Sequence, residues 1–116
     1  MSQLEIKQTV KPTTKNFVII VSVVCNYYGL DIEQLRMRDR REKTVRCRQM
    51  ICYITRKYLK GYKTTEIGKA ISQDHSNVSF SAKVMQTRID KKDIIVGWGF
   101  DAATDYYNIK QLLGIC

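Results

Sequence analysis

The stretch Thr64–Ile89, TTEIGKAISQDHSNVSFSAKVMQTRI, contains two helical patterns on either side of a short polar break. Thr64 or Thr65 can cap a short helix that continues through Ile71, and Asp74 can cap a second helix. Four apolar residues of the second segment follow one another at spacings of four, three and four: Val78, Ala82, Met85 and Ile89. This spacing is typical of a helix with one buried side. Two helices joined by a turn, the second with polar side chains in its first turn, predict a helix-turn-helix.

Two more helices are predicted near the N-terminus. A helix that starts near Thr13 or Thr14 and ends at Gly29 should be buried, because its sequence is apolar on almost every side. Asp31, with Gln34 three residues later, forms a capping box and predicts a short second helix.

A long helix is predicted over about residues 43–60, after a basic stretch, Arg36–Arg41, that has no apolar period and should be a loop. One side of this helix carries apolar residues at spacings of four, three and four: Cys47, Ile51, Ile54 and Tyr58. Arg46 falls on the opposite side, so we expect it to face solvent.

The length of 116 residues allows one domain with its own hydrophobic core. We expect an all-α, compact multi-helix fold: an N-terminal arm at 1–12, the helix-turn-helix domain at 13–92, and a C-terminal extension at 93–116 whose helix, near 104–113, packs back onto the domain. The apolar run 17–25 is less than half the roughly 20 residues that a membrane span requires. We therefore expect no membrane association and a cytoplasmic protein.

The positive charge is concentrated in one part of the chain. The formal net charge is +9, and eleven of the twenty basic residues lie between Arg36 and Lys63, where only Asp39 and Glu42 are acidic. A solvent-exposed helix surface normally mixes both signs, so this window favours a polyphosphate partner.

The sequence offers little for catalysis or metal binding. Its four cysteines, Cys25, Cys47, Cys52 and Cys116, form no C-x-x-C pair, and His75 is the only histidine. Neither a zinc site nor a nucleophile–histidine–carboxylate relay is supported, and no glycine-rich phosphate loop is present. We expect no enzymatic activity, no metal and no cofactor.

Two interpretations of the polar residues Asp74 to Asn77 remain open on spacing alone. Asp74 can cap the helix, which leaves the other three residues without a role. Alternatively, all four can contact DNA in a major groove, where Asn pairs with adenine and Asp accepts from cytosine N4. The basic window favours DNA.

Five segments resemble the C-terminal DNA-binding domain of the bacterial replication initiator DnaA, with its Trp-repressor-like helix-turn-helix. They are Val24–Leu35 (VCNYYGLDIEQL), Arg38–Arg40 (RDR), Arg48–Met50 (RQM), Glu66–Gly68 (EIG) and Asp74–Val78 (DHSNV). The last of these is similar to the most specific signature of the family. The resemblance covers roughly two thirds of the chain, in the order of the family and at nearly its spacing.

The resemblance implies double-stranded DNA as the partner and a set of contact residues: Arg38, Arg40, Arg48, Gln49, Thr64, Thr65, Asp74, His75, Ser76, Asn77 and Lys83. Arg40 would enter the minor groove, and Arg38, Arg48 and Gln49 would hold phosphates. Thr64 and Thr65 would lie near thymine methyl groups. Residues 74–77 would face bases and phosphates in the major groove, with Lys83 as a further phosphate contact.

The sequence also departs from the family pattern. Ser72-Gln73 replaces a Gly-Gly-Arg/Lys segment, and Asn77 replaces the usual threonine. The bound sequence can therefore differ from the TTATCCACA-like box of the family. We identify no segment of these 116 residues as the ATPase domain of a replication initiator, so we do not expect origin melting from them.

The first hypothesis is therefore a module that binds a specific sequence of double-stranded DNA. The second hypothesis is a protein-interaction or decoy module whose aromatic C-terminal tail binds a protein partner or a second copy of the chain. A third, non-specific RNA binding, is less favoured because aromatic residues are not interleaved with the basic run.

Overall fold

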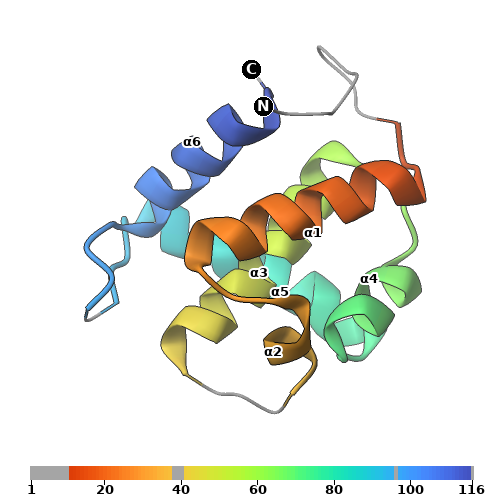
Figure 1. Cartoon of the computed structure of the whole chain (residues 1–116), viewed down its shortest axis with the longest axis horizontal. Helices are drawn as coiled ribbons and strands as arrows, with labels where there is room; N and C mark the ends of the chain where they lie inside the picture. The colour runs from red at the N-terminus through yellow and green to blue at the C-terminus, as the bar shows by residue number, and fades with distance from the viewer. Residues whose placement is uncertain (1–10, 38–40, 96, 116) are drawn as a thin grey trace.

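The computed structural model describes residues 11–37, 41–95 and 97–115. These residues form six helices: α1 (Thr14–Tyr28), α2 (Ile32–Arg36), α3 (Glu42–Tyr58), α4 (Thr64–Ile71), α5 (His75–Asp90) and α6 (Ala102–Leu113) (Figure 1). The described part contains no strand, and one isolated bridge joins Ile94 to Asp101. The prediction of an all-α fold with a helix-turn-helix is confirmed.

Helix α1 begins and ends where the sequence indicates, and α2 begins there. The expected loop from Arg36 is wrong at its first residue, because Arg36 continues α2 and pairs with Glu33 one turn back at 3.5 Å. The Thr13 side chain accepts a hydrogen bond from the Asn16 backbone amide at 3.2 Å, and Gly29 ends α1 in the left-handed conformation with φ of 71°. At the start of α2, Asp31 and Gln34 form the complete capping box.

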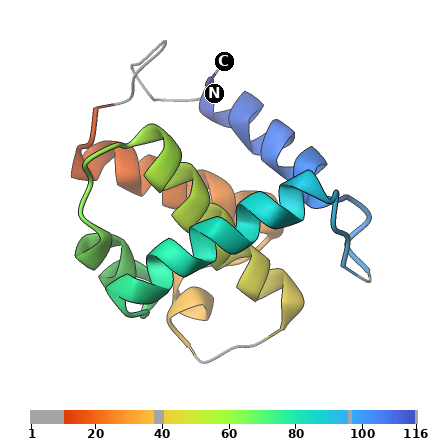
Figure 2. The same ribbon diagram turned by 180° about the vertical axis from the view of Figure 1, so that it is seen from behind.

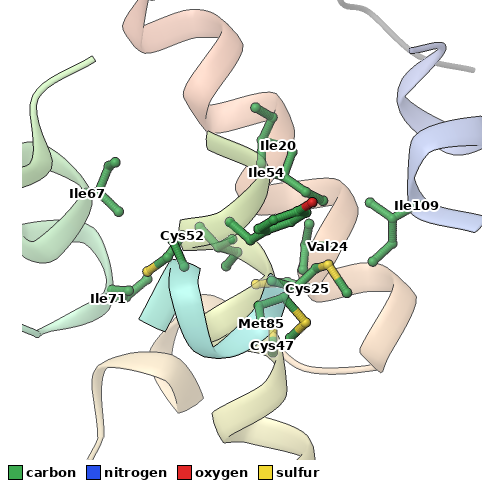
Figure 3. Packing of buried hydrophobic residues seen from close by; sticks show 14 of the residues in the cluster. Ile20, Val24, Cys25, Cys47, Cys52, Ile54, Ile67, Ile71, Met85 and Ile109 are labelled. Atoms are coloured by element: carbon green, nitrogen blue, oxygen red, sulfur yellow. The ribbon is translucent and has the colours of Figure 1, made fainter. Parts of the chain in front are cut away.

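Helix α3 is the centre of the fold. In the two opposite views α1 crosses α3 on one side and α5 crosses it on the other (Figures 1 and 2). More of α3 is therefore buried than a single stripe predicts: Met50, Cys52 and Tyr53 are buried together with Cys47 and Ile51. Figure 3 labels side chains of α1, α4, α5 and α6 that meet those of α3, and Leu35 of α2 belongs to the same core cluster.

The helix-turn-helix consists of α4, α5 and the turn between them. Ser72 ends α4 in the left-handed conformation, and the Gln73 amide donates to the Gly68 carbonyl at 2.8 Å. A Cβ atom on Gly68 would lie 2.3 Å from the Gln73 carbonyl oxygen, so this turn requires glycine at position 68. The buried Ile71 and Val78 join the two helices to the core.

The expectation that Arg46 faces solvent is wrong, because its side chain is only 1% exposed. Its guanidinium pairs with Asp105 of α6 at 3.5 Å, and with Asp93 at 3.1 Å. Buried charges require such partners. Arg46 therefore connects the central helix to the segment that follows α5.

Asp105 is completely buried and accepts hydrogen bonds from three aromatic side chains. The Tyr27 hydroxyl donates to it at 2.8 Å, the Tyr28 hydroxyl at 3.0 Å, and the Trp98 indole at 2.9 Å. Burial, reinforced by the Asp105 carboxylate, raises the pKa of Tyr27 to about 12 and that of Tyr28 further. Residues 93–115 are thus joined to α1 and α3 through a polar network as well as through apolar packing.

Candidate nucleic-acid interface

The first turn of α5 projects polar side chains into solvent. Asp74, His75, Ser76 and Asn77 are all exposed, whereas Val78 is completely buried. Asp74 occupies the N-cap position, as predicted, but its side chain makes no capping hydrogen bond. The capping role therefore does not account for the Asp74 carboxylate, which is accessible to a ligand.

An open hollow of about 940 Å³ lies beside this turn, and we call it the interhelical hollow. Helices α2, α3 and α4 and the start of α5 contribute to its lining (Figure 1). The lining residues are Arg36, Met37, Val45, Arg48, Thr65, Gly68, Lys69, Ser72, Gln73, Asp74, His75 and Asn77. Most of these side chains are polar, and such a surface suits a hydrated, charged ligand better than an apolar one.

The hollow unites five of the predicted site residues: Arg48, Thr65, Asp74, His75 and Asn77. They come from α3, α4 and the start of α5, and only the fold brings them together. Of these five, all but Arg48 are exposed.

The other four predicted residues in the described part of the chain lie outside the lining of the hollow. Ser76 and Lys83 are exposed on α5, and Thr64 is half-buried at the start of α4. Gln49 is half-buried on α3, and its side-chain oxygen is buried without a hydrogen-bond partner. A buried acceptor of this kind cannot itself bind an anionic phosphate; only the amide N–H groups could.

Arg48 makes contacts that its predicted role did not include. Its side chain is buried, and its guanidinium donates to the carbonyl oxygens of Leu35 at 2.9 Å and Met37 at 2.6 Å. These bonds hold the end of α2 and the first residue after it against α3. Arg48 therefore positions Met37, the residue that precedes the basic segment 38–41, which we call the basic loop.

Arg38 and Arg40 lie outside the described residues. Both neighbours of this segment, Met37 and Arg41, are exposed. Met37 also lines the interhelical hollow, so the basic loop begins beside the first turn of α5.

Two charged residues of the lining were not among the predicted site residues. Arg36 pairs with Glu33 at 3.5 Å and donates to the Ala70 carbonyl at 3.3 Å, and Lys69 pairs with Glu66 at 3.7 Å. Both ion pairs are exposed and therefore weak, so a phosphate can replace the carboxylate in each. The spacing offered a signal for Lys69, which follows Thr65 by four residues and so shares its side of α4.

The described residues contain no group of three or more metal-ligating side chains. Within the same ranges, no helix has the length and apolar character needed to cross a membrane.

A comparison with protein families identifies the matching part of the chain. The family described as the helix-turn-helix of the bacterial DnaA protein matches residues 18–84, which is more than half of the chain. The match runs from α1 into α5 and includes every residue that lines the interhelical hollow. No curated protein matches the chain.

Proposed function

The chain belongs to the helix-turn-helix family of the bacterial DnaA protein, a family of DNA-binding domains, and from this premise we propose that it recognises a specific double-stranded sequence. In this proposal the first turn of α5 enters the major groove while the basic loop after Met37 enters the adjacent minor groove. The observation that carries it is that His75, Asn77 and Met37 line one hollow. A rigid protein can place two elements in neighbouring grooves only if both lie on the same side.

The base contacts are assigned to the exposed side chains at 74–77. Asn77 can pair with adenine, the Asp74 carboxylate can accept from cytosine N4, and Ser76 can donate or accept. His75 can donate to a base or to a phosphate. The free carboxylate of Asp74 supports this assignment, because a carboxylate occupied by capping could not also accept from a base.

The phosphate contacts are assigned to the cations around the base-reading turn. Lys83 follows Ser76 by seven residues, so it lies on the same side of α5 two turns further on. Arg36 and Lys69 line the interhelical hollow, and Gln49 is kept as an amide donor to a phosphate. Such contacts set the register of the protein and carry no sequence information.

Arg40 is proposed to enter the minor groove, where a narrow A·T-rich stretch attracts arginine, and Arg38 to contact its flanking phosphates. Arg48 is proposed to act on this loop from inside the protein, through its bonds to Leu35 and Met37. Thr65, and Thr64 beside it, are proposed to approach thymine methyl groups.

The proposed biological role is regulatory or related to replication, in the cytoplasm where bacterial DNA lies, and it needs no catalysis or cofactor from these residues. The bound sequence is proposed to be related to the TTATCCACA box, with a change at the base that Asn77 faces.

Fluorescence anisotropy tests the proposal. A labelled duplex carrying TTATCCACA and a scrambled duplex of the same composition are titrated at several salt concentrations, and the sequence is then varied base by base. The four cations assigned to phosphates, Arg36, Arg38, Lys69 and Lys83, predict that log K falls with log[salt] at a slope of about −4 on either duplex. Equal affinities for every sequence would remove sequence specificity, whereas His75→Ala should reduce the preference for the better duplex.

One observation favours the second candidate function, a protein-interaction module. Among the described residues after 92, four large apolar side chains are exposed: Ile94, Phe100, Tyr107 and Leu112. Sedimentation equilibrium of the wild type and Tyr107→Glu separates the two functions. A dimer that Tyr107→Glu dissociates, with DNA binding unaffected by His75→Ala, would support this candidate instead.

A further inference from the structure

Phe80 is an apolar side chain in an unusual place. It lies on α5, one turn beyond the exposed polar residues, and it is 65% exposed. Its side of the helix is opposite to the one that contacts the core, where Val78 and Met85 are completely buried. The core therefore does not explain a large aromatic ring at this position.

The neighbours of Phe80 on the exposed side of α5 indicate what its ring would contact in a complex with DNA. Ser76 precedes it by four residues and Lys83 follows it by three, so the three side chains form one row along the helix. Ser76 and Lys83 are about 10 Å apart along the helix axis, and Phe80 lies between them. If Ser76 contacts a base and Lys83 a phosphate, the ring of Phe80 must lie against the DNA.

The chemistry of the ring limits what it can recognise. A phenylalanine side chain neither donates nor accepts a conventional hydrogen bond, so it cannot read the polar edges of the bases. The 5-methyl group of thymine is the apolar feature that a base pair presents in the major groove. A ring held between a base contact and a phosphate contact is suited to cover that methyl group.

We propose that Phe80 is a specificity-determining residue that selects thymine by contact with its 5-methyl group, at a base pair next to the one that Ser76 contacts. This inference rests on the proposed function, because it requires α5 to lie in the major groove. It adds an apolar contact to a recognition surface otherwise assigned to polar side chains.

Replacement of thymine by uracil tests the inference, because it removes the methyl group and leaves base pairing unchanged. The probe is the tightest-binding duplex from selection on a randomised library, synthesised with each thymine in turn replaced by uracil. For the wild type we expect one replacement, apart from those at thymines that meet Thr64 or Thr65, to weaken binding by about fourfold, the factor that corresponds to one buried methyl group. For Phe80→Ala we expect about tenfold weaker binding to the thymine duplex and no further loss at that position.

Two control variants accompany the test. Phe80→Leu keeps an apolar side chain and should retain most of the discrimination between thymine and uracil. Val18→Ala removes a comparably exposed apolar side chain, 55% exposed, from α1 and should leave the discrimination unchanged. Circular dichroism checks that each variant is folded.

The outcomes separate this inference from the proposed function. Selective binding in which wild type and Phe80→Ala respond equally to every uracil would overturn the role of Phe80 and leave sequence-specific binding intact. A selection that yields no preferred sequence would overturn the proposed function and this inference with it. If uracil at one position weakens binding by the wild type and by the two control variants but not by Phe80→Ala, the result supports the proposed function and the role of Phe80.

Discussion

Substitution of Asp105 by alanine removes the carboxylate on which the C-terminal segment depends. Asp105 is fully buried, and it accepts from Tyr27, Tyr28 and Trp98 while it pairs with the buried Arg46. In Asp105→Ala, the three aromatic donors lose their acceptor, and Arg46 keeps Asp93 as a carboxylate partner.

The expected loss of folding stability follows from the burial of the Asp105 and Arg46 charges. Removing one partner of a buried ion pair costs about 3–5 kcal/mol. Asp93 still compensates part of the Arg46 charge, but the Tyr27, Tyr28 and Trp98 donors lose their acceptor as well, so we expect a cost within this range. A domain of this size is stable by about 5–15 kcal/mol, so the substitution removes a large fraction of its stability. With about 2.1 cal/mol/K of unfolding entropy per residue, each kcal/mol corresponds to about 4 °C, and we expect Tm to fall by about 12–20 °C.

Thermal and urea unfolding followed by circular dichroism measure the effect. Asp90→Ala is the matched control, because Asp90 is also an aspartate that accepts a side-chain hydrogen bond, from Gln86, but it is exposed. We expect this control to change stability by less than about 1 kcal/mol. A stability for Asp105→Ala within that range would refute the conclusion that the Arg46–Asp105 pair holds the extension in place.

Three further predictions concern the helix-turn-helix and the tyrosines. Lys83→Ala should weaken DNA binding equally for all sequences and reduce the steepness of the salt dependence by about one unit, measured by anisotropy titration. Gly68→Ala should destabilise the fold, measured by urea unfolding, because the new Cβ would meet the Gln73 carbonyl oxygen at 2.3 Å and force the turn to shift. Stability should fall as pH rises from about 10 towards 12, because Tyr27 and Tyr28 keep their protons in the folded state while they ionise when unfolded; melting temperatures from pH 8 to 11 for the wild type and Tyr27→Phe measure this loss.

The sequence predicts those elements of the fold that local interactions determine. The N-terminus of α1, the capping box of α2 and the start of α5 each depend on residues within one helical turn, so Thr13, Asp31 and Asp74 identify them. The burial of Arg46 was not predictable in this way. Its partners, Asp93 and Asp105, are far along the chain, and helical periodicity carries no information about distant carboxylates.

The same distinction applies to the candidate site. Residues 74–77 precede the apolar stripe of α5, which begins at Val78. Their position in the first turn of the helix was therefore sufficient to predict that they are exposed. The carbonyl partners of Arg48 depend on how α2 lies against α3, and its sequence context resembles that of a surface arginine. A basic residue in a charged window can therefore be internal, and the formal excess of +9 overstates the charge available to DNA.

Helix α5 connects the interhelical hollow to the segment that begins at Asp93. Its first turn lines the interhelical hollow, and at its other end Arg88 pairs with Asp93, the residue that also pairs with Arg46 of α3. Met85, just beyond the part of the chain that matches the family, is completely buried in the core. With its middle packed in the core and its last turn tied to α3, α5 can present its first turn in a fixed orientation relative to Met37, whose carbonyl accepts from Arg48. Preorganisation of this kind reduces the conformational entropy lost on binding, so we expect residues far from the hollow to contribute to DNA affinity without touching DNA.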